Sequence, residues 1–154
     1  MQYRNQLGNI YFIKKYVTKT CLKMIVFNQI ISRLDYCNSV YIGLPKYLLR
    51  KMQIILNKAA RLVSGSTVDE RITPELINLH WLPINYIICY LVHIARLSQK
   101  PSYLSKLITS TRNRLFVPRV NSSYGKRTFS YNGPICYDSL PLHLKEVKIL
   151  YLIS

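Results

Sequence analysis

The clearest hydrophobic pattern in the chain lies between Pro45 and Ser64, and it predicts an amphipathic helix. Apolar residues recur there at spacings of three and four, at Leu48, Met52, Ile55, Ala59 and Leu62. Pro45 suits the first helical position, where a missing N–H leaves no hydrogen bond unmade. Gly65 is well placed to end the helix in a left-handed conformation. The basic residues fall mostly off the apolar stripe, at Lys46, Arg50, Lys51, Lys58 and Arg61. One face is therefore expected to be buried and the other to be basic.

Two further helices are predicted before this one. Residues 3–17 carry a moderate apolar pattern, and residues 18–34 carry a broad apolar face. The second helix is expected to begin at a capping Thr18 or Thr20. Its β-branched and aromatic content leaves a strand as the alternative, although its length favours a helix. A connection is expected over 35–43, where asparagine, serine and glycine interrupt the pattern.

After the central helix, three more helix starts follow. Thr73-Pro74-Glu75 combines a capping hydroxyl, a proline and an acid, and the helix that it begins is expected to run through Trp81. Pro83 and Pro101 are each expected to begin another helix. The apolar stripe after Pro83 consists of Ile84, Ile87, Ile88, Leu91, Ile94 and Ala95.

The pattern changes beyond these helices. Residues 109–131 interleave basic and aromatic residues with serine, threonine and asparagine, which predicts a loop with short extended pieces. Gly133-Pro134 is expected to begin a last helical turn, and Leu140-Pro141 to end it. The fold class expected is mainly α: a small multi-helix domain of roughly five to seven helices with an irregular basic segment near the C-terminus. The division expected is a helical domain over 1–110 and a basic, loop-rich segment over 111–154 packed on it.

Charge adds a functional expectation to this fold. Lysine and arginine number 22 against 6 acids, a net charge of +16. Such a balance favours polyanionic partners, of which nucleic acid is the commonest. No acid lies between Glu75 and Asp138. An anionic membrane surface and a missing acidic partner domain are the competing explanations of this charge. Separately, no apolar run approaches the ~20 residues that a membrane-spanning helix needs.

The candidate binding residues lie in the acid-free region. Basic side chains there could contact phosphates, and the rings between them, Phe116, Tyr124 and Phe129, could stack on bases. The nucleic-acid-binding residues predicted are Arg112, Arg114, Arg119, Lys126 and Arg127.

Catalytic and metal chemistry find little support. Asp69 and Glu70 are adjacent in a polar loop and are not joined by other acids, whereas two-metal catalysis needs clustered carboxylates. Cys89 and His93 stand four residues apart on one predicted helix face, as a zinc or thiol hydrolase would require, but a buried thiol and a packed imidazole explain the pair better. The glycines are isolated, so no phosphate-binding loop is present. No catalytic residue, metal or cofactor is therefore expected.

Cysteine usage and the chain start bear on location. The cysteines at 21, 37, 89 and 136 form no Cys-x-x-Cys pair, and the first residues are polar rather than those of a signal peptide. An intracellular protein with free thiols is expected.

Several motifs together resemble a known family. In chain order they are Ser32-Arg33-Leu34-Asp35-Tyr36-Cys37-Asn38-Ser39, Gly43-Leu44-Pro45, Leu56-Asn57-Lys58-Ala59-Ala60-Arg61-Leu62-Val63, Ile72-Thr73-Pro74, Leu79-His80-Trp81-Leu82-Pro83, Pro101-Ser102-Tyr103-Leu104, Val117-Pro118-Arg119 and Ser139-Leu140-Pro141-Leu142. This series resembles the C-terminal, post-polymerase region of reverse transcriptases from LINE-type (non-LTR) retrotransposons, and it covers about residues 10–145. The resemblance implies part of an RNA-directed DNA polymerase of a transposable element, without its polymerase or endonuclease active sites.

The function expected is accordingly non-catalytic. The chain is expected to bind RNA or DNA through the backbone without reading sequence. Its expected partners are nucleic acid and the polymerase domain that this region follows in the family, with no membrane. Two alternatives stay open: a protein-interaction or packing module whose basic residues only keep it soluble, and a relic reading frame without a function.

Overall fold

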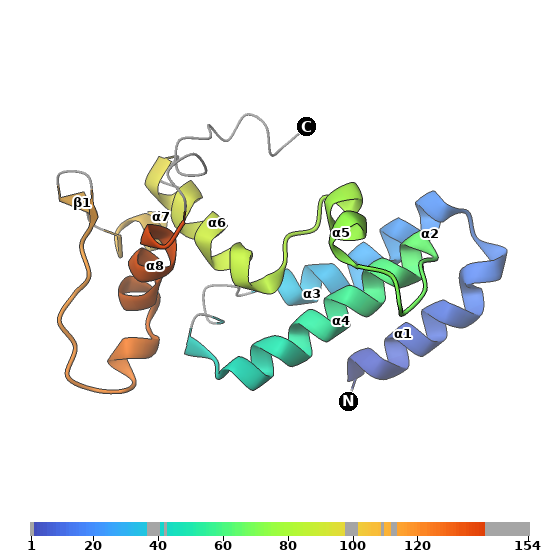
Figure 1. Ribbon diagram of the computed structural model, residues 1–154, viewed down its shortest axis with the longest axis horizontal. Coiled ribbons are helices and arrows are strands. Elements are labelled where there is room, and N and C mark those ends of the chain that lie inside the picture. Colours follow the sequence, from blue (N-terminus) through green and yellow to red (C-terminus); the bar gives the residue numbers. More distant parts are fainter. Residues whose placement is uncertain are drawn as a thin grey trace. The chain divides into compact units, whose positions relative to one another are not determined.

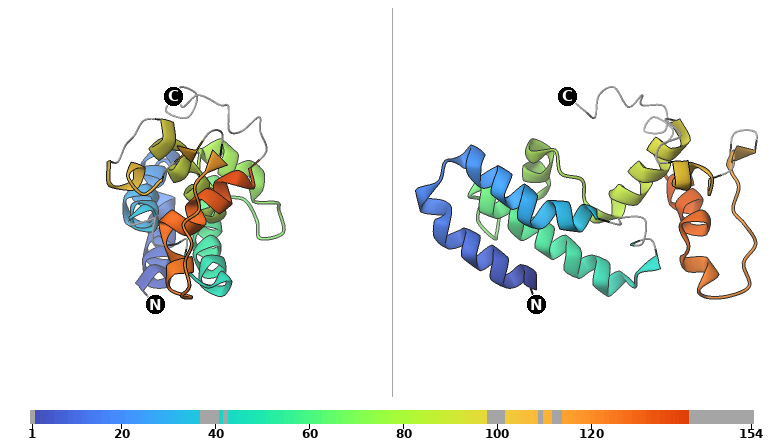
Figure 2. Two further views of the ribbon diagram at one scale, coloured as in Figure 1. Left: turned by 90° about the vertical axis from the view of Figure 1, so that its left-hand side faces the viewer. Right: turned by 180° about the vertical axis from the view of Figure 1, so that it is seen from behind.

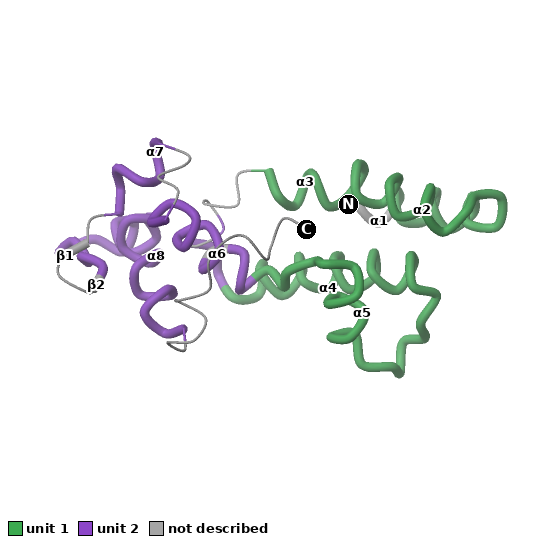
Figure 3. Tube along the Cα trace, turned by 90° about the horizontal axis from the view of Figure 1, so that it is seen from above, with its two compact units in different colours: residues 1–37, 46–84 green, residues 38–45, 85–154 purple. Residues whose placement is uncertain are grey.

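The computed structural model describes residues 2–36, 41, 43–97, 102–108, 110–111 and 114–140. These residues are mainly helical, which confirms the expected fold class. They belong to two compact units, residues 1–37 with 46–84 (unit 1) and residues 38–45 with 85–154 (unit 2), as Figure 3 shows. The boundary after residue 84 differs from the division expected at 110, because α6 (Ile84–Leu97) supplies much of the core of unit 2.

Unit 1 is built from helices (Figure 1). They are α1 (Gln2–Ile13), the 3₁₀ helix η1 (Lys14–Tyr16), α2 (Lys19–Val26), the π-helical segment η2 (Phe27–Ile31), α3 (Ser32–Asp35), α4 (Lys46–Ser64) and α5 (Thr73–Leu79). α2, η2 and α3 follow one another without a break, so the stretch predicted as one helix is helical throughout and the alternative strand does not form. Thr18 caps α2, because its hydroxyl accepts a hydrogen bond from the Cys21 N–H at 3.3 Å.

Helix α4 is the central element of unit 1. It packs against α1, α2, η2 and α5, and Figure 2 shows α1, α2 and α4 side by side. The predicted bounds are confirmed to within one residue, since α4 begins just after Pro45. Burial is concentrated in its C-terminal half, at Leu56, Ala59, Ala60, Leu62 and Val63. The predicted stripe residues Leu48, Met52 and Ile55 are only partly buried. The N-terminal half of α4 is therefore more open than its periodicity suggests.

Gly65 ends α4 as the sequence predicts. Its φ is +86°, and its N–H donates to the Arg61 carbonyl oxygen at 2.8 Å. A side chain is strained in this left-handed region, so Gly65→Ala is expected to lower the free energy of unfolding by about 1–2 kcal/mol. Gly8 is the matched control, because it lies within α1 and an added Cβ would meet nothing within 4 Å. Gly8→Ala is expected to raise stability by about 0.5–1 kcal/mol. Urea denaturation of both variants checks the opposite signs, and a change of the same sign in both contradicts this explanation.

Helix α5 ends earlier than the sequence predicts. It begins at Thr73 as expected, with Pro74 in its first turn, but it stops at Leu79. His80 adopts a left-handed conformation with φ of 59°, which turns the chain, and the Trp81 N–H then closes back on the Leu76 carbonyl oxygen at 2.9 Å. Trp81 is buried beyond the helix end rather than within the helix. The expectation that Trp81 belongs to this helix was therefore wrong.

Unit 2 surrounds a second hydrophobic core. Its elements are α6 (Ile84–Leu97), whose first residue groups with unit 1, α7 (Ser102–Ser105), the antiparallel strands β1 (Ser110–Thr111) and β2 (Arg114–Leu115), the 3₁₀ helix η4 (Gly125–Arg127) and α8 (Phe129–Asp138). The core comprises Val92, Ala95, Leu104, Leu115, Phe129 and Tyr137. Val92 is fully buried although it lies outside the predicted stripe of α6, whereas Leu91 and Ile94 are only partly buried. The buried face of α6 is thus rotated relative to the prediction.

Helix α8 corrects a second prediction. Gly133-Pro134 lies inside this helix, which already begins at Phe129, rather than at its start. Both residues are buried, and a Cβ at Gly133 would lie 3.1 Å from Cγ2 of Val92. Gly133 therefore lets α8 approach α6 closely. The predicted end is close, because α8 stops at Asp138 and the Leu140 N–H donates to the Tyr137 carbonyl oxygen. Pro101 and residues 141–154 lie outside the described residues.

Within the part of the chain that the structure describes, no single helix is both long and apolar enough to cross a bilayer. α5 and α6 reach the required length and apolarity only when counted together across the bend between them.

Candidate nucleic-acid interface

The segment from Arg119 to Arg127, here called the basic turn, folds back on itself. The Gly125 N–H donates to Oγ of Ser122 at 3.0 Å, and the Arg127 N–H donates to the Tyr124 carbonyl oxygen at 2.9 Å. A Cβ at Gly125 would lie 2.9 Å from Cβ of Val120, so glycine allows the close approach. The segment next to Arg119 is thereby held against the start of η4.

Contacts on both sides fix this turn within unit 2. The Asn132 side chain in α8 donates a hydrogen bond from Nδ2 to the Lys126 carbonyl oxygen. The hydroxyl of Thr128 donates to the Gly125 carbonyl oxygen at 2.7 Å. A Cβ at Gly43 would lie 2.6 Å from both Cβ and the carbonyl oxygen of Arg127, so the backbone passes close to Arg127 there. The basic turn is thus attached to the first turn of α8, and Gly43 lies close to Arg127.

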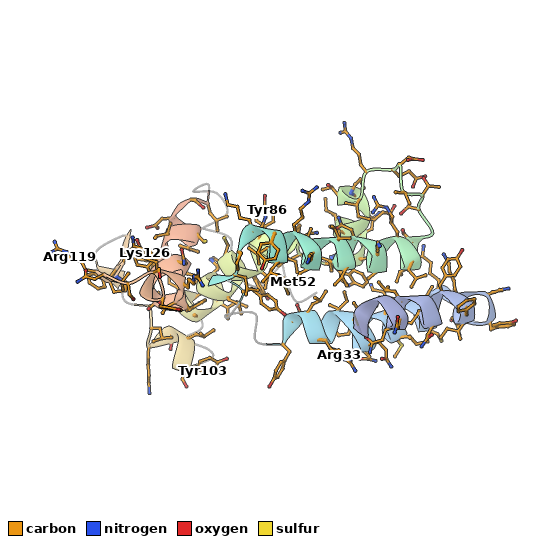
Figure 4. The ribbon with its side chains drawn as sticks, turned by 90° about the horizontal axis from the view of Figure 1, so that it is seen from below. Arg33, Met52, Tyr86, Tyr103, Arg119 and Lys126 are labelled. Atoms are coloured by element: carbon orange, nitrogen blue, oxygen red, sulfur yellow. The ribbon has the colours of Figure 1, made fainter. Side chains whose placement is uncertain are left out.

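Three of the five predicted binding residues lie on the basic turn. Arg119, Lys126 and Arg127 are all exposed, and Figure 4 labels the first two at the left-hand end of its view. Arg114 lies in β2, where its backbone pairs with Thr111. Arg112 lies outside the described residues.

The aromatic residues of the acid-free region divide into two groups. Tyr124 is 79% exposed, and the Arg127 guanidinium carbon lies 5.9 Å from the centre of its ring. Phe116 is 53% exposed. Phe129, by contrast, is 7% exposed and belongs to the core of unit 2. The suggestion that Phe129 stacks on bases was wrong, because its ring packs inside the protein. Tyr124 with Arg127 is the arrangement available for stacking.

Cys89 and His93 are packed core groups with their own partners. Sγ of Cys89 donates to the Cys136 carbonyl oxygen at 3.5 Å, and Nδ1 of His93 lies 3.2 Å from the Tyr137 hydroxyl. Burial, and to a lesser degree the neighbouring Cys136 thiol, raises the pKa of Cys89, which keeps this thiol protonated at neutral pH. Among the residues with described positions, no three His, Cys, Asp or Glu side chains gather as a metal site requires.

Unit 2 also contains a partly buried polar cluster that the sequence pattern does not predict. Tyr137 is 1% exposed, and its hydroxyl accepts a hydrogen bond from Nη1 of Arg96 at 3.3 Å. Because the guanidinium only donates, the Tyr137 O–H can donate in turn to Nδ1 of a neutral His93. The His93 and Tyr137 rings also stack, with centroids 5.9 Å apart. His93 and Arg96 lie 44 and 41 residues before Tyr137, so no local sequence pattern indicates this cluster, which lies between α6 and α8.

Comparison with known proteins gives no match for this chain among family models, curated proteins or solved structures.

Proposed function

We propose that this chain is a non-catalytic nucleic-acid-binding protein that contacts the phosphate backbone without reading sequence. The observation that carries the proposal is the basic turn, which presents Arg119, Lys126 and Arg127 to solvent on a segment tied to α8. Contacts from such side chains position a nucleic acid but carry no base-specific information. The protein surface that binds is therefore a small electropositive site with one ring beside it.

Charge distribution supports the same function. No acid occurs between Glu75 and Asp138, so the sequence around the basic turn offers no carboxylate to neutralise its cations. The exposed ring of Tyr124, next to the Arg127 guanidinium, can stack on an unpaired base of any identity. Together these features favour single-stranded nucleic acid as the ligand of the basic turn.

The motif resemblance supplies a biological setting for this proposal. A piece of a LINE-type reverse transcriptase that follows the polymerase region would meet template RNA and target DNA continually. Sequence-independent backbone contacts suit that role, because a mobile element copies a long transcript rather than one short site. The proposed partners are accordingly RNA or DNA, together with the polymerase domain of such an enzyme.

Titration of the whole chain against homopolymer RNAs tests the proposal. Oligonucleotides of adenine, uracil and cytosine, about 20 nucleotides long, are each expected to bind with about the same dissociation constant. Fluorescence anisotropy of labelled oligonucleotides at low salt measures it. Binding to one homopolymer alone would mean that bases are read, which contradicts the proposal.

A further inference from the structure

Two side chains at the start of α8 bind consecutive carbonyl oxygens of the basic turn. The hydroxyl of Thr128, the residue before α8, donates a hydrogen bond to the Gly125 carbonyl oxygen at 2.7 Å. Nδ2 of Asn132, in the first turn of α8, donates to the Lys126 carbonyl oxygen. These two carbonyl groups belong to the peptide units on either side of the Lys126 Cα atom. The backbone at Lys126 is therefore tied to the start of α8 on both sides.

The Asn132 side chain serves the turn rather than the helix that carries it. A carbonyl oxygen only accepts hydrogen bonds, so the Asn132 amide has to present its NH₂ group to Lys126. The backbone N–H of Asn132 already donates to the Thr128 carbonyl oxygen at 3.0 Å, and this bond forms whatever side chain stands at position 132. The side-chain bond therefore adds nothing to the hydrogen bonding of α8 itself, and its effect falls on the basic turn.

Two exposed cations stand on the backbone that is tied in this way, Lys126 and Arg127. The Arg127 N–H donates to the Tyr124 carbonyl oxygen at 2.9 Å, so the next peptide unit is fixed as well. The Cα atoms that carry both cations are thus placed before a ligand arrives. A site that is ordered in advance loses less conformational entropy on binding, and its affinity is higher for the same contacts.

From these bonds we propose that Asn132, together with Thr128, is a positioning residue of the basic turn. It holds the backbone of Lys126 in the conformation that binds phosphates, and it does not itself contact the nucleic acid. This inference rests on the proposed function, because it concerns the same site. Removing the Asn132 donor then lowers the affinity without changing the number of phosphates contacted, whereas removing a cation lowers the affinity and the salt slope together.

The test variant is Asn132→Leu, because leucine is similar in size and has no donor. Anisotropy titrations with a labelled uracil homopolymer of about 20 nucleotides, at several salt concentrations, give both the affinity and its salt slope. Asn132→Leu is expected to weaken binding by about 5–10-fold, because the turn regains freedom that binding has to remove. Its salt slope is expected to equal that of the wild-type protein. Lys126→Gln is the reference for a lost phosphate contact, and its slope is expected to be less steep by about 0.7.

Ser139→Ala is the matched control at the other end of α8. Oγ of Ser139 donates to the Cys136 carbonyl oxygen at 2.6 Å, so this variant loses the same kind of bond and is expected to keep the wild-type affinity. If circular dichroism shows that Asn132→Leu does not fold, Thr128→Val, which removes the second donor with little change in size, takes its place with the same expected pattern.

Three results would overturn the inference: an unchanged affinity in the folded variant, a slope less steep by about 0.7 as in Lys126→Gln, or an equal loss of affinity in Ser139→Ala. Failure of the proposed function is a different result, because the wild-type protein itself would then not bind the RNA.

Discussion

Replacing Arg119, Lys126 and Arg127 together with glutamine is expected to weaken binding of single-stranded RNA by about 100-fold at ~0.1 M salt. Each contact to a single strand contributes about 0.7 to the salt slope. At one decade below the ~1 M reference, three contacts are therefore worth a factor of about 10². All three side chains are exposed, so the substitutions remove charge without opening the core. Anisotropy titrations of both proteins with the same labelled homopolymer measure the effect.

The matched control for this variant removes an equal charge elsewhere. Lys15→Gln, Lys19→Gln, Lys23→Gln lowers the net charge by the same three units, from exposed positions in unit 1. It is expected to weaken single-strand binding by less than about threefold, because only cations that contact phosphates contribute to the salt-dependent affinity. An equal loss in both variants would show that overall charge, rather than the basic turn, determines affinity.

Tyr137→Ala is expected to destabilise unit 2 by about 3–5 kcal/mol, the largest stability effect that the structure suggests. The Tyr137 ring is 1% exposed within the core, and its hydroxyl bonds to His93 and Arg96. Truncation leaves a large cavity and deprives the buried His93 of this partner. A loss of this size is comparable with the whole stability of many small domains. Thermal or urea unfolding followed by circular dichroism measures it.

Tyr137→Phe separates the two contributions. This variant keeps the ring and removes only the hydroxyl, so about 1–3 kcal/mol of destabilisation is expected from the lost hydrogen bonds. If Tyr137→Phe proved as damaging as Tyr137→Ala, the hydrogen bonds would dominate over packing. If Tyr137→Ala unfolded like the wild-type protein, Tyr137 would have no part in the core, against the structure.

Features that depend on neighbours in sequence were predictable. The apolar spacing in α4, the capping hydroxyl of Thr18 and the left-handed Gly65 are all set within a few residues, so pattern and turn chemistry were enough to find them. The end of α5 was not, because Trp81 extends the apolar spacing while the chain has already turned at His80. Burial of an apolar residue and membership of a helix are different properties, and periodicity alone does not separate them.

The composition of the candidate interface was predictable, but its detailed structure was not. An acid-free run indicated where the cations lie, yet it could not distinguish Tyr124, which is exposed, from Phe129, which is buried in the core. That difference arises because α8 begins at Phe129, earlier than Gly133-Pro134 suggested. The close approach of Gly43 to Arg127 likewise joins segments more than 80 residues apart. Such long-range contacts leave no trace in local spacing.

The central proposal is that exposed lysine and arginine side chains of this chain bind the phosphate backbone of a nucleic acid. A titration of the intact protein with a homopolymer RNA at increasing salt tests it most directly. If the three cations of the basic turn contact phosphates, log affinity falls linearly with log salt, with a slope of about −2 or steeper. No measurable binding at low salt, or an affinity that does not change with salt, would contradict the claim.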